Sequence, residues 1–73
     1  MSLVIGKVYV LSGWVFDSEA LDRNGGKFTC VAHDGDEPDP EYEFRGVEDG
    51  AQQWCYLSIT GGDDGIAIVE HKG

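Results

Sequence analysis

The densest group of chemically active side chains in this 73-residue chain is an acidic stretch from Asp34 to Glu43. Six of its ten residues carry a carboxylate and none is basic. The acidic residues are Asp34, Asp36, Glu37, Asp39, Glu41 and Glu43. Carboxylates that converge from one loop are the ligands that Ca²⁺ prefers. The EF-hand pattern fails, because Pro38 stands where a ligand is needed and the sixth position has no glycine, which leaves only a different kind of cation site as a hypothesis.

The same carboxylates suggest a second chemistry, the imitation of a nucleic-acid backbone. Side chains two positions apart on a strand lie roughly 6.8 Å apart, so Glu41 and Glu43 could present a regular row of negative charge. Such a row would compete with phosphates for the Lys and Arg side chains of a nucleic-acid-binding protein. Small acidic phage-encoded inhibitors of nucleases act in this general way, although the analogy is one of charge and size. The competing interpretation is a solvated acidic loop that only aids solubility.

Two aromatic residues are the next candidates for binding. Trp54 and Tyr56 lie two positions apart, so in a strand they point to the same face. Exposed aromatic side chains mark protein interfaces and surfaces on which ligands stack. Stacking on nucleic-acid bases also needs a positive groove, so a protein interface or a homodimer is more consistent with this composition. The competing interpretation is that the first strand or the Asp17–Gly26 segment covers both rings.

Cysteine and histidine side chains could in principle ligate a metal or act as nucleophile and base. Cys30, Cys55, His33 and His71 lack the short paired spacings from which zinc sites are recognised, so we expect no metal. The sequence also has no Gly-x-Ser-x-Gly elbow and no Gly-Lys-Ser/Thr phosphate loop. Two buried thiols are favoured over a disulfide, which would need neighbouring strands and a shared face. The chain is therefore predicted to have no cofactor and no enzymatic activity.

The overall charge restricts the class of partner. Five Lys and Arg residues face fourteen Asp and Glu residues, which gives a formal net charge of -9. Such a surface repels phosphate backbones and anionic lipid headgroups, so direct binding to nucleic acid or to a membrane is not expected. Basic proteins are the partners that it would attract. The segment 1–16 is too short and too interrupted for a membrane span and lacks a basic start, so a cytoplasmic location is the expectation.

Strands are the elements that must position these side chains. The segment 41–45 alternates regularly between apolar and charged residues, which predicts a strand with its charged residues in solvent. The segment 27–33 is also predicted to be a strand, with Phe28, Cys30 and Ala32 on one side and Thr29, Val31 and His33 on the other. The side chains predicted to face the core from these two segments are Phe28, Cys30, Tyr42 and Phe44. The segment 34–40 between them contains two prolines and a glycine, so it is predicted to be an exposed loop.

A β-hairpin is predicted at the C-terminal end of the chain. The run Gln52–Thr60 is rich in aromatic and β-branched residues, and it leads through the Gly-rich segment 61–65 into the apolar run 66–70. Two such runs around a Gly-rich connection are typical of adjacent antiparallel strands. Alternation places Cys55 on one face of the first run and the two aromatic candidates on the other.

The first third of the chain is predicted to form a strand followed by a connection with two possible structures. Leu3–Phe16 is an extended apolar segment that Ser12-Gly13 interrupts, which indicates a strong bend or two short strands. In Asp17–Gly26, the dipeptide Asn24-Gly25 favours a tight hairpin or a long β-loop. A short helix capped by Asp17 or Ser18 is the alternative.

Together, these patterns predict a single all-β domain over residues 1–73. The fold class is a small five- or six-stranded antiparallel meander, either a partly open SH3-like or OB-like barrel or a strongly bent sheet. The predicted function is a small acidic interaction domain that binds a protein partner through its acidic face, its outer aromatic residues, or both. The alternatives are an inhibitor that mimics nucleic-acid charge and a barrel that binds a small ligand or a cation. The residues expected to bind the partner are Trp54, Tyr56, Glu41, Glu43, Asp36, Glu37 and Asp39.

Overall fold

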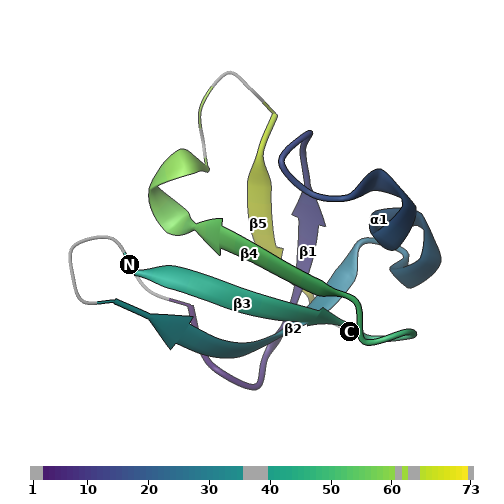
Figure 1. The fold of residues 1–73 in the computed structure, drawn as a ribbon, viewed down its shortest axis with the longest axis horizontal. Helices are drawn as coiled ribbons and strands as arrows, with labels where there is room; N and C mark the ends of the chain where they lie inside the picture. The colour runs from purple at the N-terminus through teal and green to yellow at the C-terminus, as the bar shows by residue number, and fades with distance from the viewer. Residues whose placement is uncertain (1–2, 36–39, 61, 63–64, 73) are drawn as a thin grey trace.

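The computed structural model describes residues 3–35, 40–60, 62 and 65–72, which form one five-stranded antiparallel sheet with one α-helix (Figure 1). The strands are β1 (Val8–Ser12), β2 (Lys27–Asp34), β3 (Glu41–Gly46), β4 (Gln52–Tyr56) and β5 (Ala67–Glu70). The helices are α1 (Ser18–Asn24) and the 3-10 helix η1 (Leu57–Ile59). The predicted small all-β fold with an open, bent antiparallel sheet is confirmed.

The order of strands in the sheet is β4-β3-β2-β1-β5. Strands β1 to β4 follow one another as the predicted meander, but β5 lies beside β1, with Val10 opposite Val69 and Leu11 opposite Ile68. The predicted hairpin between the run at Gln52–Thr60 and the last strand is therefore wrong. The run is also shorter than predicted, because the chain leaves β4 at Tyr56 and closes a 3-10 turn in which the backbone N–H of Thr60 donates to the carbonyl of Leu57 at 3.1 Å.

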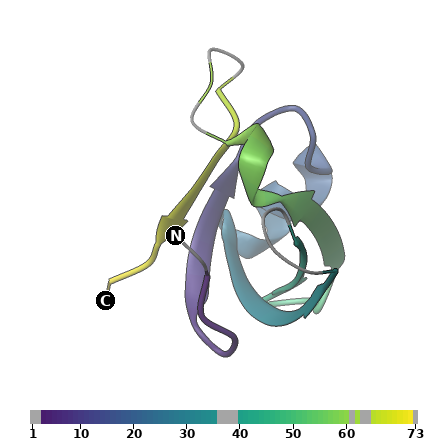
Figure 2. The same cartoon turned by 90° about the vertical axis from the view of Figure 1, so that its left-hand side faces the viewer.

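The sheet bends along β2, which is shared between two neighbours. The start of β2 pairs with β1, where Thr29 lies opposite Val8, and β2 also pairs with β3. The β2–β3 register shifts between Cys30 and Ala32, which leaves Val31 in a bulge. A bulge increases the local twist and bends the strand. Figure 2 shows the resulting curvature of β2, which gives the sheet a concave inner face and a convex outer face.

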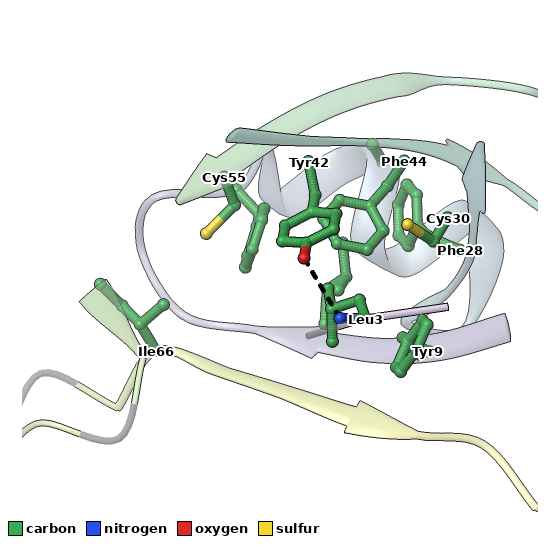
Figure 3. Close-up of a cluster of buried hydrophobic side chains, with 11 residues drawn as sticks. Leu3, Tyr9, Phe28, Cys30, Tyr42, Phe44, Cys55 and Ile66 are labelled. Carbon is green, nitrogen blue, oxygen red and sulfur yellow. Dashed lines mark hydrogen bonds between the residues drawn. The ribbon is translucent and has the colours of Figure 1, made fainter. Parts of the chain in front are cut away.

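The core fills the concave face of this sheet (Figure 3). The four side chains predicted to face inward, Phe28, Cys30, Tyr42 and Phe44, are all buried. Tyr9 packs edge-on against Phe44, with ring centroids 6.4 Å apart. The Tyr42 hydroxyl accepts a hydrogen bond from the backbone N–H of Leu3 at 3.3 Å, which holds the start of the chain against the core. Burying a large apolar side chain contributes about 1.5–3 kcal/mol, so these rings are the main source of stability.

The segment predicted as a hairpin or β-loop at Asp17–Gly26 is instead the helix α1, so the weaker alternative is the correct one. The Asp17 side chain caps the start of the helix by accepting from the backbone N–H of Glu19 at 3.0 Å. Gly25 adopts the left-handed conformation at φ 60°, and the backbone N–H of Gly26 donates to the carbonyl of Leu21 at 2.8 Å. The glycines that favoured a tight turn thus terminate a helix, because both structures need a residue that tolerates positive φ.

Candidate functional site

The pairing of β3 with β4 brings the two predicted groups of binding residues onto one face of the sheet. Trp54 lies opposite Glu43 and Tyr56 lies opposite Glu41. Cβ atoms of such opposed residues are about 4.5–5.5 Å apart, so each ring lies beside a carboxylate. Cys55, between the two aromatic residues, points into the core and is only 2% exposed. We call the surface formed by Trp54, Tyr56, Glu41 and Glu43 the outer β3–β4 face.

The two aromatic rings are substantially exposed. The exposed fraction is 38% for Trp54 and 45% for Tyr56. Helix α1 ends at Asn24, whose side chain packs against Gly46 at the turn end of the hairpin, and its Ala20 belongs to the buried core. Both residues are therefore exposed, and the alternative in which other segments bury them is wrong. β4 is also the terminal strand of the sheet, so this face lies at the edge of the molecule's largest element.

The carboxylate of Glu43 is held in place by its neighbours. Its Oε2 atom accepts from Nε of Arg45 at 2.9 Å and from Nε2 of Gln52 at 3.0 Å. The side chain of Glu43 is 14% exposed, so much of its charge is compensated within the domain. Of the two carboxylates predicted to form a regular row of free charge, Glu43 is thus compensated by Arg45, and Glu41 is left.

A second carboxylate, that of Asp34, lies beside Glu41 on the neighbouring strand β2. Asp34 at the end of β2 lies opposite Glu41, which lies opposite Tyr56 on its other side. Cross-strand partners share a face, so these three side chains form a row across β2, β3 and β4. Among the residues that the structure places, neither Asp34 nor Glu41 forms an ion pair. This end of the face is therefore negatively charged and uncompensated.

The remaining predicted site residues, Asp36, Glu37 and Asp39, lie outside the described residues. Within the described part of the chain, no group of three or more His, Cys, Asp or Glu side chains is placed to hold a metal ion. The proposed cation loop between Asp34 and Pro40 thus stays a prediction.

The two cysteines are separated by a strand. Cys30 lies on β2 and Cys55 on β4, with β3 between them, and both are free buried thiols. The interpretation as core thiols is confirmed. Burial raises the pKa of the Cys30 thiol, although a backbone hydrogen bond from Ala32 opposes the shift, so this thiol stays protonated at neutral pH. His33 lies beside the ring of Tyr42, with ring centroids 6.1 Å apart.

Two features were not predicted from the sequence. Trp14 is 76% exposed, and only the preceding Ser12-Gly13 break signalled that it leaves the strand. The buried side chain of Asn24 forms hydrogen bonds to Glu48 and Asp49 in the turn between β3 and β4, and no local pattern indicated them.

Comparisons with protein-family models, with curated proteins and with solved structures found no match to this chain. Among the described residues, no helix is both long and apolar enough to cross a membrane.

Proposed function

We propose that this chain is a small non-catalytic interaction domain that binds a protein partner through the outer β3–β4 face. The observation that carries the proposal is the cross-strand pairing that places Trp54 and Tyr56, both substantially exposed, directly beside Glu43 and Glu41. Aromatic residues supply much of the affinity at protein interfaces, and surrounding charges select the partner and speed the encounter. Both contributions come from adjacent positions on one rigid pair of strands.

The rigidity of the face supports this function. Glu43 is fixed by Arg45 and Gln52, and the adjacent Trp54 belongs to a strand whose Cys55 is anchored in the core. A pre-formed surface loses less conformational entropy on binding than a loop that must become ordered. The outer β3–β4 face is therefore well suited to binding.

The inhibitor function, in which the domain mimics nucleic-acid charge, has less support. A mimic needs free negative charges at regular spacing, whereas Arg45 compensates one of the two carboxylates proposed for that role. The net charge of -9 still opposes direct contact with nucleic acid or anionic lipid and favours a basic partner. A cytoplasmic location and the small-ligand or cation-binding alternative stay predictions.

The test is affinity capture from a lysate of the source organism at low and at high salt, with three immobilised proteins compared. These are the wild type, the double variant Trp54→Ser/Tyr56→Ser, and the control Val69→Ser. Val69 is also an exposed apolar residue, 59% exposed, but it lies on β5 at the opposite end of the sheet. Circular dichroism and urea unfolding establish that each variant is folded.

We expect one partner to be retained by the wild type and by Val69→Ser and to be lost by the double variant. With that partner purified, the double variant should bind at least about tenfold more weakly, since each interface aromatic contributes on the order of 1 kcal/mol or more. A partner bound equally well by the folded double variant would show that the outer β3–β4 face is not the binding site.

A further inference from the structure

Two carboxylates lie opposite each other at one end of the outer β3–β4 face, that of Glu41 on the face and that of Asp34 beside it on β2. Like charges in that position destabilise a sheet. Each of the three ion pairs among the described residues engages other carboxylates, namely Lys7 with Glu70, Arg23 with Asp49 and Arg45 with Glu43. The repulsion between Asp34 and Glu41 is therefore not relieved within the described part of the domain.

The aromatic rings beside Asp34 and Glu41 are suited to binding a cation. Tyr56 lies opposite Glu41, and Trp54 lies on the diagonal, about 7–8 Å away and within reach of long side chains. A cation over the face of a Trp or Tyr ring is attracted by the ring's electron density. A guanidinium group can also form paired hydrogen bonds to a carboxylate, which a lysine ammonium cannot do with the same geometry.

We propose that Trp54, Tyr56, Glu41 and Asp34 together bind an arginine side chain from a basic segment of the partner protein. The inference rests on the proposed function, because it names the chemistry of the partner that docks on the same face. The occupant follows from charge complementarity: two uncompensated carboxylates and two exposed rings on a domain of net charge -9 match a planar cation. A second copy of this chain is disfavoured, since it would bring two such negative faces together.

The proposal predicts opposite effects on stability and binding when the two carboxylates are neutralised. In Glu41→Gln/Asp34→Asn, the repulsion between the strands disappears, so the urea midpoint should be equal to or higher than that of the wild type. The same variant should bind an arginine-containing peptide more weakly. A purely structural role for these carboxylates would not produce this combination.

The probe is a twelve-residue peptide of alternating Arg and Gly, measured by isothermal titration calorimetry at two salt concentrations. It is compared with analogues in which Lys, or the neutral near-isostere citrulline, replaces Arg. The matched control is Glu48→Gln/Asp22→Asn, which removes the same types and number of charges from exposed positions on the β3–β4 turn and on α1.

We expect Glu41→Gln/Asp34→Asn to lower the affinity for the Arg peptide about tenfold, and the control less than about twofold. Trp54→Ser/Tyr56→Ser, at unchanged net charge, should lower it by about fivefold or more. The citrulline peptide should not bind.

Equal losses in the charge variant and its control would show that the peptide is attracted by net charge alone, and would overturn the proposal. Absence of binding by the Arg peptide to the wild type would also overturn it. These failures are distinguishable from failure of the proposed function, which the capture experiment decides separately. A captured partner that needs Trp54 and Tyr56 but tolerates Glu41→Gln/Asp34→Asn would leave the binding face in place and refute its preference for arginine.

Discussion

The two ends of the β3–β4 hairpin use their side chains in opposite ways. At the turn end, the amide of Asn24 is 2% exposed and forms four hydrogen bonds. It donates to the carbonyl of Ala20 and to Asp49, and it accepts from the backbone N–H groups of Glu48 and Asp49. On the outer face, by contrast, two large rings are left partly in solvent and two carboxylates oppose each other.

This difference separates a part of the molecule built for stability from a part available for binding. A chain of this size buries only about 60% of the surface that its unfolded state exposes, so each buried group has a large influence on whether it folds. The network around Asn24 joins α1 to the hairpin and leaves its own polar groups satisfied. The outer β3–β4 face contributes little to that connection, and substitutions in the two regions should therefore have distinct consequences.

The largest effect is expected from Asn24→Leu. The substitution keeps a similar volume but leaves the carbonyl of Ala20 and the N–H groups of Glu48 and Asp49 without their side-chain partner. Leaving a buried polar group unsatisfied costs about 1–3 kcal/mol. The bonds to the two N–H groups are only partly buried, so we expect a loss of about 2–3 kcal/mol in the free energy of unfolding. Urea unfolding measures it. A loss below about 1 kcal/mol would mean that the turn does not depend on this amide.

A somewhat smaller loss is expected from Gly46→Ala. A Cβ atom at Gly46 would lie within 2.4–2.5 Å of the Asn24 amide, which its four hydrogen bonds prevent from moving freely. Overpacking of this kind costs about 1–3 kcal/mol. The control Gly62→Ala meets no atom within 4 Å and should change the unfolding free energy by less than about 0.5 kcal/mol.

The same contact can be isolated with a double-mutant cycle. In an Asn24→Ala background, the Gly46→Ala substitution should cost much less, because the atoms that it would strike are absent. Additive losses in the cycle would show that the cost of the new methyl group arises elsewhere.

A pH-dependent effect is expected from Arg23→Met. The hydrogen bond from Arg23, assisted by those from the Ala51 backbone and Asn24, lowers the pKa of Asp49 from 3.8 to about 2. A carboxyl with a lowered folded-state pKa contributes stability above its unfolded pKa and loses that contribution as the pH falls through its folded pKa. The wild type should thus exceed the variant in stability above pH 4, and the difference should shrink between pH 4 and pH 2.

Urea unfolding at a series of pH values measures this difference. The control is Asp49→Asn, which removes the titrating group, so adding Arg23→Met to it should introduce no further pH dependence in that range. A difference between wild type and Arg23→Met that stays constant from pH 6 to pH 2 would exclude Asp49 as its source.

Much of the fold was predictable because short-range alternation decides which side chains are buried. Tyr42 and Phe44 alternate with charged residues, as do Phe28 and Cys30 with polar ones, and all four face the core as expected. The pairing of β5 with β1 was not predictable in this way, since the apolar pattern of a strand does not specify which strand lies beside it. The Asn24-Gly25 dipeptide was ambiguous for a physical reason, because a hairpin and a helix end make the same demand on φ.

The candidate site was likewise predictable only in part. Alternation alone indicated that Trp54 and Tyr56 share a face, but their exposure depends on where distant segments pack. The contact between Arg45 and Glu43 lies within β3, whereas the hydrogen bond from Gln52 to Glu43 and the row that joins Asp34 to Tyr56 depend on cross-strand register. The β3–β4 register is set at the turn that joins these two strands, and the β2–β3 register includes the bulge in β2. Neither feature can be derived from charge spacing.

The smallest effect on stability is expected from Trp54→Ser/Tyr56→Ser, which would complete the contrast with Asn24. The two residues are 38% and 45% exposed, so their removal takes less buried apolar area from the fold than the loss of a core ring would. The free energy of unfolding should change by less than about 1 kcal/mol, as for most surface substitutions. Urea unfolding of this variant and of Asn24→Leu under the same conditions compares the two losses directly. A loss above about 2 kcal/mol would show that the two rings stabilise the fold. The outer β3–β4 face would then not differ in its role from the hydrogen-bond network around Asn24.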